Sequence, residues 1–199
     1  ELSPVDLVFL LDESGSMGDG KNGKREQKGE PGTAALKAFY ADAASAGITA
    51  SLTVFPQNLN MTMKEADQNK PASCKATDYE MPLVPPSALP DDKKFADAIA
   101  TLDPPNEFGT PTLPALSGTI TYAQSVLKED PARKVAIVMV TDGEPYGCGN
   151  GNSVNATAAA AAKVADTIPT YVIGVGKELG SLNAIAVGGG TDKAFIVAL

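Results

Sequence analysis

Histidine and tryptophan are absent from this chain of 199 residues, and only two cysteines are present. Without histidine, no imidazole is available to activate a serine nucleophile or to bind a transition metal. Cys74 and Cys148 have no neighbour at CxxC spacing, so a zinc or redox motif is not expected. Any metal site must therefore use oxygen ligands, which favours Mg²⁺, with Ca²⁺ or Mn²⁺ as alternatives.

Long apolar runs and an excess of positive charge are also missing. No stretch approaches the roughly 18 to 20 continuous apolar residues of a membrane-spanning helix, and the first residues do not resemble a signal peptide. The net charge of −8 argues against binding to nucleic acid or to an anionic membrane. We expect no insertion into a membrane and one domain over residues 1–199, either as a mature chain or as part of a larger protein.

Short apolar runs alternate with amphipathic stretches along the chain, which predicts alternating strands and helices. This alternation is typical of a parallel sheet with helices on both faces. The runs at 5–11 and 135–141 are apolar enough to be strands buried on both faces. The other expected strands are 49–55, 81–84 (an edge strand, because prolines flank it), 171–175 and 194–197, and the expected helices are 33–46 (capped by Thr33), 91–102, 113–127, 153–167 and 179–187.

Oxygen-bearing side chains follow the two most apolar strands. Asp12-Glu13-Ser14-Gly15-Ser16 comes directly after the first of them, and in a non-helical turn its Asp and two Ser side chains can face one small, hard cation. Asp142 ends the second, and Thr110 lies in a turn before the helix at 113–127, which we expect Thr112 to cap. Ligands bind such sheets at the carboxyl ends of the strands, where the winding reverses. Taken alone, however, Asp followed by Ser and Gly is also an ordinary loop opening.

These residues resemble the metal-ion-dependent adhesion site of von Willebrand factor A (vWA) domains, the module also inserted in integrins. The matching positions, in chain order, are Asp12, Ser14, Ser16, Thr110 and Asp142. The resemblance runs from the first strand to the last. It implies a three-layer α/β/α, doubly wound fold with a mostly parallel six-stranded sheet of order 3-2-1-4-5-6, whose third strand is an antiparallel edge. In the family the hydroxyls coordinate Mg²⁺ and the acids act partly through water.

Such a site implies a binding or adhesion module rather than an enzyme. Three hydroxyls and two partly water-mediated acids leave at least one position of the Mg²⁺ octahedron for another ligand. Neutral hydroxyls also leave the charge of the ion under-compensated, so the expected ligand is an Asp or Glu carboxylate of a protein partner. We expect the rim of the site to include Gly15, Gly143, Glu144 and Tyr146, and the isolated domain to be monomeric.

Two polar segments without periodicity, 18–32 and 56–81, are expected near the metal. The first is a departure from the family, which usually begins its first helix soon after the second serine. Their basic residues can steer an acidic partner, although a solvated loop is the simpler interpretation. Cys74 lies in the second segment and Cys148 follows Asp142 closely, so both are expected on the same face. We expect them to form a disulfide, with two free thiols as the alternative, and therefore an extracellular, cell-surface or periplasmic location.

Two other functions remain as alternatives. A phosphoryl-transfer enzyme of the haloacid dehalogenase type also opens with a strand that ends in Asp and uses Mg²⁺. It needs a second acid two residues later, where this chain has Ser14. An intracellular vWA domain that docks onto an ATPase or chelatase complex is the other alternative, and reduced cysteines would favour it.

Overall fold

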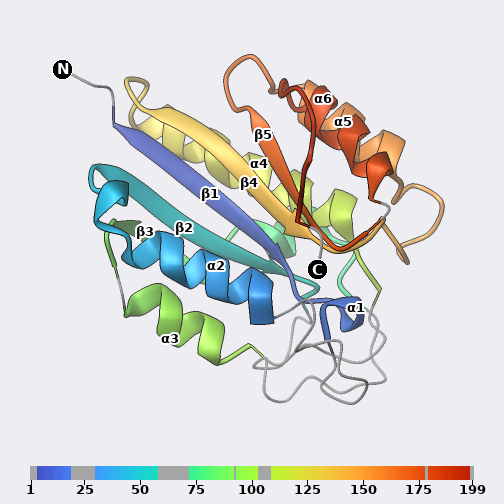
Figure 1. Cartoon of the computed structure of the whole chain (residues 1–199). Helices are drawn as coiled ribbons and strands as arrows, with labels where there is room; N and C mark the ends of the chain where they lie inside the picture. Colours follow the sequence, from blue (N-terminus) through green and yellow to red (C-terminus); the bar gives the residue numbers. More distant parts are fainter. Residues whose placement is uncertain are drawn as a thin grey trace.

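A six-stranded sheet forms the centre of the protein (Figure 1). The computed structural model describes residues 4–18, 30–57, 72–91, 93–102, 109–177 and 179–197. The strand order is β3-β2-β1-β4-β5-β6, and among the described strands the β2–β3 pair is antiparallel and the others are parallel. This confirms the predicted sheet order. The strands are β1 (Val5–Asp12), β2 (Ile48–Phe55), β3 (Val84–Ala88), β4 (Lys134–Thr141), β5 (Thr170–Val175) and β6 (Phe195–Val197).

Helices cover both faces of the sheet because successive side chains of the central strands point in opposite directions. On β1, Val8 and Leu10 belong to the core beneath α4 (Thr112–Glu129), α5 (Val154–Ala162) and α6 (Asn183–Gly188). Phe9 and Leu11 belong to the opposite core, beneath α2 (Glu30–Ala41) and α3 (Lys94–Ala100). The expected three-layer architecture is therefore confirmed (Figure 1).

The strands at the centre of the sheet match their predicted ranges closely, but several other bounds were wrong. The edge strand β3 begins at Val84, where the prediction for it ended, and it includes Pro85 and Pro86, whose side chains are exposed. A β-bulge interrupts its pairing with β2, and an edge position tolerates prolines because their missing N–H groups need no partner there.

The first long helix was also predicted with the wrong ends. α2 begins at Glu30 rather than after Thr33, and the Thr33 hydroxyl donates to the Glu30 carbonyl instead of capping the helix. The helix ends at Ala41 because the Asp42 side chain accepts from the Ala44 N–H and starts a separate 3₁₀ turn. Similar shortening affects three other helices: α3, α5, and α6, which follows a 3₁₀ turn at Gly180–Leu182.

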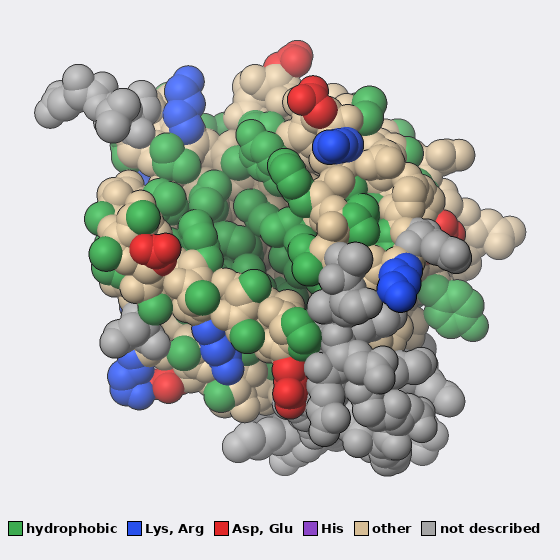
Figure 2. Space-filling view, viewed as in Figure 1, with side chains coloured by type: hydrophobic (Ala, Val, Ile, Leu, Met, Phe, Trp, Pro, Cys, Tyr) green, Lys and Arg blue, Asp and Glu red, His purple; other side chains and the backbone are tan. Residues whose placement is uncertain are grey.

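One sheet face is covered unevenly. A groove of about 290 Å³ lies between α2 and strands β1, β4 and β5. Figure 2 shows this region as a continuous apolar hollow in the middle of the molecule. Its lining includes Phe9, Phe39, Val138, Ile173 and Val197. Within the described ranges, no helix is both long and apolar enough to cross a lipid bilayer.

Candidate functional site

The neighbouring strands β1 and β4 place two acids at one edge of the sheet. β1 ends at Asp12, and Asp142 directly follows β4. The Ser16 hydroxyl donates to Asp142 Oδ1 at 2.7 Å, and the Oγ atoms of Ser14 and Ser16 lie 3.1 Å apart. The two loops, although 126 residues apart in sequence, therefore meet through their side chains. Four of the five predicted ligands, Asp12 among them, belong to this group.

Asp12 is completely buried. Its Oδ1 accepts the Ser14 N–H at 2.8 Å, and its Oδ2 accepts the Thr141 hydroxyl at 2.5 Å. Burial raises the pKa of Asp12 from 3.8 to about 6; the charge of Asp142 also raises the pKa, whereas the hydrogen bonds from Thr141 and Ser14 lower it. A positive charge at this position would stabilise the ionised form.

The two serines lie on the short helix α1 (Gly15–Gly18) or directly before it. The sequence pattern favoured a non-helical turn here, and that prediction was wrong. The Ser14 carbonyl accepts from the Met17 N–H at 2.9 Å, and the Met17 side chain is buried in the core beneath α2. Burial of Met17 therefore favours a helical turn at this point and fixes the direction of Ser16.

Thr110, the fifth predicted ligand, is tied to the Asp142 loop through its backbone. The Thr110 N–H donates to the Tyr146 carbonyl at 2.8 Å, and the Tyr146 N–H donates to the Thr110 carbonyl at 3.0 Å. Gly109 has a φ of 80°, and a Cβ there would lie 3.0 Å from the Tyr146 oxygen, so this close approach requires glycine. Thr110 is buried at the same edge of the sheet as the acids.

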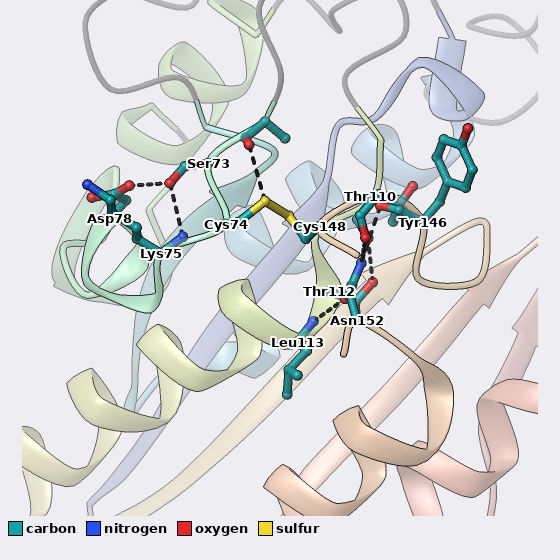
Figure 3. Close-up of a disulfide and its surroundings, with 12 residues drawn as sticks. Ser73, Cys74, Lys75, Asp78, Thr110, Thr112, Leu113, Tyr146, Cys148 and Asn152 are labelled. Atoms are coloured by element: carbon teal, nitrogen blue, oxygen red, sulfur yellow. Dashed lines mark hydrogen bonds between the residues drawn. A yellow bond between two sulfur atoms is a disulfide. The ribbon is translucent and has the colours of Figure 1, made fainter. Parts of the chain in front are cut away.

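Asn152 lies beside the site although no sequence pattern predicted a role for it. Its Nδ2 donates to the carbonyls of Thr110 at 2.9 Å and of Tyr146 and Gly147 at 3.2 Å each. Its Oδ1 accepts the Leu113 N–H at 2.9 Å (Figure 3). An Asn before a helix reads as an ordinary turn residue, and nothing in its local sequence points to partners some 40 positions away.

Because Asn152 bonds to the first turn of α4, the N-terminal cap of this helix differs from the prediction. Thr112 is the first residue of the helix rather than its cap, and its hydroxyl donates to the Thr110 carbonyl at 3.3 Å. Pro111 occupies the N-cap position without a side-chain hydrogen bond. The cap bond to the first turn comes instead from Asn152, a side chain that is distant in sequence.

The expected disulfide between Cys74 and Cys148 is present, with Cα atoms 5.5 Å apart (Figure 3). Cys148 has a φ of 58° and lies between Gly147 and Gly149, whose φ angles are also positive. The bond ties the site loop to a segment that ends in a 3₁₀ turn at Ala76–Tyr79. This turn lies directly against α4, because a Cβ at Gly118 would be 2.2 Å from the Ala76 oxygen.

The predicted rim residues lie on the two loops that carry the acids. Gly15 begins α1, and a Cβ at Gly143 would be 4.0 Å from Ser16 Oγ. Glu144 is exposed, and Tyr146 is 74% exposed. Most of the two polar segments expected near the metal lies outside the described residues, at 19–29 and 58–71, together with all of their basic residues except Lys75.

The donors at this edge are chemically suited to a hard divalent cation. The set consists of carboxylates and hydroxyls, which Mg²⁺, Ca²⁺ and Mn²⁺ prefer. The set includes two acids, Asp12 and Asp142. The negative charge of Asp142 raises the pKa of Asp12, and a bound cation would relieve this repulsion. No group of three or more His, Cys, Asp or Glu side chains gathers in the described ranges, so an acid-rich or thiolate metal site is not found there. The residues present fit Mg²⁺.

The sheet order, its antiparallel edge and the helices on both faces define a vWA-like fold. Solved structures share it. The SpRpn10 VWA domain matches 98% of this chain and 87% of its own, with a TM-score of 0.58 and 17% identity. Proximal thread matrix protein 1 from the mussel byssus, also 17% identical, matches 92% of this chain with a TM-score of 0.58. The pilus adhesin SpaC from Lactobacillus rhamnosus GG, again 17% identical, matches 87% of this chain with a TM-score of 0.56.

These matches establish the fold. The chain spans 41% of the length of the mussel protein and 25% of the SpaC chain. The sequence matches no protein-family model and no curated protein. What the chain binds must therefore be argued from its own site.

Proposed function

We propose that this chain is a metal-dependent binding module whose site holds Mg²⁺ and engages a carboxylate of a protein partner. The ligands of the ion are Asp12, Ser14, Ser16, Thr110 and Asp142. The observation that carries the proposal is the hydrogen bond from Ser16 to Asp142, which joins two loops in one group of oxygen donors at the carboxyl edge of the sheet. Ca²⁺ and Mn²⁺ are alternative ions for the same oxygen donors.

The carboxylate of the partner follows from the charge of the donor set. Hydroxyls are neutral, and Asp12 is engaged by the Ser14 N–H and the Thr141 hydroxyl. Because Asp12 acts through water in this arrangement, the donors in direct contact with the ion do not balance its two positive charges, so an anionic ligand is favoured over a neutral one. On the rim, the exposed ring of Tyr146 offers an apolar contact beside the bound carboxylate.

A binding role is favoured over phosphoryl transfer by the residues around Asp12. The position two residues later is Ser14, whose N–H donates to Asp12 Oδ1, so no second acid is available there to protonate a leaving group. The disulfide supports an extracellular, cell-surface or periplasmic location over the intracellular alternative. SpaC and the byssus protein, a pilus adhesin and a thread matrix protein with the same fold, are consistent with this location.

Water-proton relaxation with Mn²⁺ as the probe tests both parts of the proposal. Mn²⁺ held by the site with a water ligand is expected to enhance relaxation, and excess acetate is expected to reverse the enhancement by replacing that water. Ser16→Ala removes a donor and is expected to weaken Mn²⁺ binding about tenfold, which corresponds to about 1.4 kcal/mol.

Ser87→Ala is the matched control, because it removes the hydroxyl of another serine, one that is buried on the edge strand β3. This variant is expected to bind Mn²⁺ like the wild type. Equal Mn²⁺ affinity in Ser16→Ala and the wild type would contradict the metal site. An enhancement that acetate leaves unchanged would contradict the carboxylate bridge.

A further inference from the structure

We infer that Asn152 is a positioning residue of the metal site, which acts by fixing Thr110 against the loop that carries Asp142. The inference rests on the proposed function, since Thr110 is one of the proposed ligands. Asn152 is 8% exposed and precedes Ser153, the N-cap of α5, outside the group of oxygen donors. It therefore acts through other residues and not on the ion itself.

The side chain of Asn152 joins three parts of the chain at one point. Its amide nitrogen faces three carbonyl groups, two of them on the loop after β4 and one at Thr110. Its amide oxygen faces the first turn of α4 at Leu113. Figure 3 shows the side chain between Thr110 and Leu113. Three acceptors on one side and a donor on the other define which end of the amide is nitrogen.

This arrangement decides the position of Thr110. The bridge to Tyr146 alone would tie Thr110 to a loop that continues into Gly147, Cys148 and Gly149, all with positive φ. Asn152 adds a bond to the Thr110 carbonyl and a second bond to the Tyr146 carbonyl, so both strands of the bridge are held from the same buried point. Its bond to Leu113, which lies three residues after Thr110, also fixes the first turn of α4.

Mg²⁺ titration calorimetry on the full chain, combined with thermal unfolding without metal, tests the inference. Asn152→Ala is expected to raise the Kd for Mg²⁺ about tenfold, within the range observed for residues that orient metal ligands. The matched control is Asn183→Ala, which removes another asparagine side-chain bond to the backbone, the one from the Ala194 N–H near the β6 edge of the sheet. Its Kd for Mg²⁺ is expected to stay within twofold of the wild type.

A double-mutant cycle separates positioning from a general loss of stability. If Asn152 acts through Thr110, then Asn152→Ala is expected to cause no further loss of Mg²⁺ affinity in a Thr110→Ala background. In a Ser14→Ala background, the same substitution is expected to cause its full tenfold loss. A merely structural role would lower the melting temperature in every background without producing this pattern.

Asn152→Asp is a second variant that keeps the shape of the side chain and the acceptor for Leu113, in case Asn152→Ala does not fold. It replaces the donor to three carbonyls by an acceptor. Its added negative charge attracts Mg²⁺, so weaker binding in this variant can only come from misplacement of the ligands.

Unchanged or tighter Mg²⁺ binding in the folded Asn152 variants overturns the inference and leaves the proposed function standing. A full tenfold loss added on top of Thr110→Ala also overturns it. Absence of Mg²⁺ binding in the wild type is a different result, because it overturns the proposed function and the inference together.

Discussion

Asp12 shows how a single buried carboxyl group links the site to pH. It has no exposed surface, and the groups around it include a second acid, Asp142. A strand that ends in a buried Asp is costly without a cation, because burial favours the neutral form of the side chain. When Asp12 is ionised, it and Asp142 together place negative charge where the proposed ion lies.

The raised pKa of Asp12, about 6 against 3.8, predicts the pH dependence of stability without metal. Between these values the folded state binds the proton and the unfolded state does not, so stability falls as the pH rises from about 4 to about 6. The loss between these two pH values is about 2 kcal/mol. Urea unfolding of the metal-free protein at both pH values measures this loss. Asp12→Asn is expected to remove it, and an equal loss in this variant would contradict the assignment to Asp12.

At the residue scale, sequence patterns pointed to the proposed ligands but not to Asn152, the side chain that we infer to position Thr110. Asp12, Ser14 and Ser16 follow a strand, and Asp142 follows its neighbour, so strand pairing alone brings them to one edge. Asn152 has no such pattern. Its role depends on carbonyl groups of a loop conformation that only the folded chain defines.

At the scale of elements, the 3₁₀ turn Ala76–Tyr79 and helix α4 form a support for the site. The Tyr79 side chain is buried, its hydroxyl donates to the Ser73 carbonyl at 2.7 Å, and the turn lies against Gly118 of α4. The disulfide connects this turn to the loop after β4 and closes a separation of 74 residues. Closing a loop of that length stabilises by about 4 kcal/mol in the chain-entropy model.

Gly118→Ala tests this contact. Alanine favours a helix, but its Cβ would be 2.2 Å from the Ala76 oxygen, so the turn must move away from α4. We expect the free energy of unfolding to fall by about 2 kcal/mol, measured by urea denaturation. In Gly151→Ala, the added Cβ has no atom within 4 Å, and little change is expected. Wild-type stability in Gly118→Ala would contradict the close packing of the turn on α4.

Element prediction succeeded where burial alone decides the structure. β1 and β4 are apolar on both faces, and their predicted ranges differ from the observed ones by one residue. Prediction was less accurate where side chains compete with the helix for backbone groups, as Asp42 does at the end of α2. It was also less accurate for β3, because its start is set by pairing with β2 and not by its own residues.

At the scale of the whole molecule, the resemblance supplied the order of the sheet, which alternation of strands and helices does not determine. That order puts β1 and β4 side by side at the centre, and the reversal of winding between them creates the edge where the acids meet. An acidic chain with a net charge of −8 attracts divalent cations from solution. The fold, the charge and the donor set all favour a cation at this edge.

A crystal soaked in Mn²⁺, with the anomalous signal of the metal recorded, shows whether an ion binds among these oxygen donors. We predict an anomalous peak within coordination distance of Asp12, Ser14, Ser16, Thr110 and Asp142, directly or through water, with a further ligand from solvent or from a carboxylate. A peak elsewhere only, or none at this edge of the sheet at saturating Mn²⁺, would contradict it.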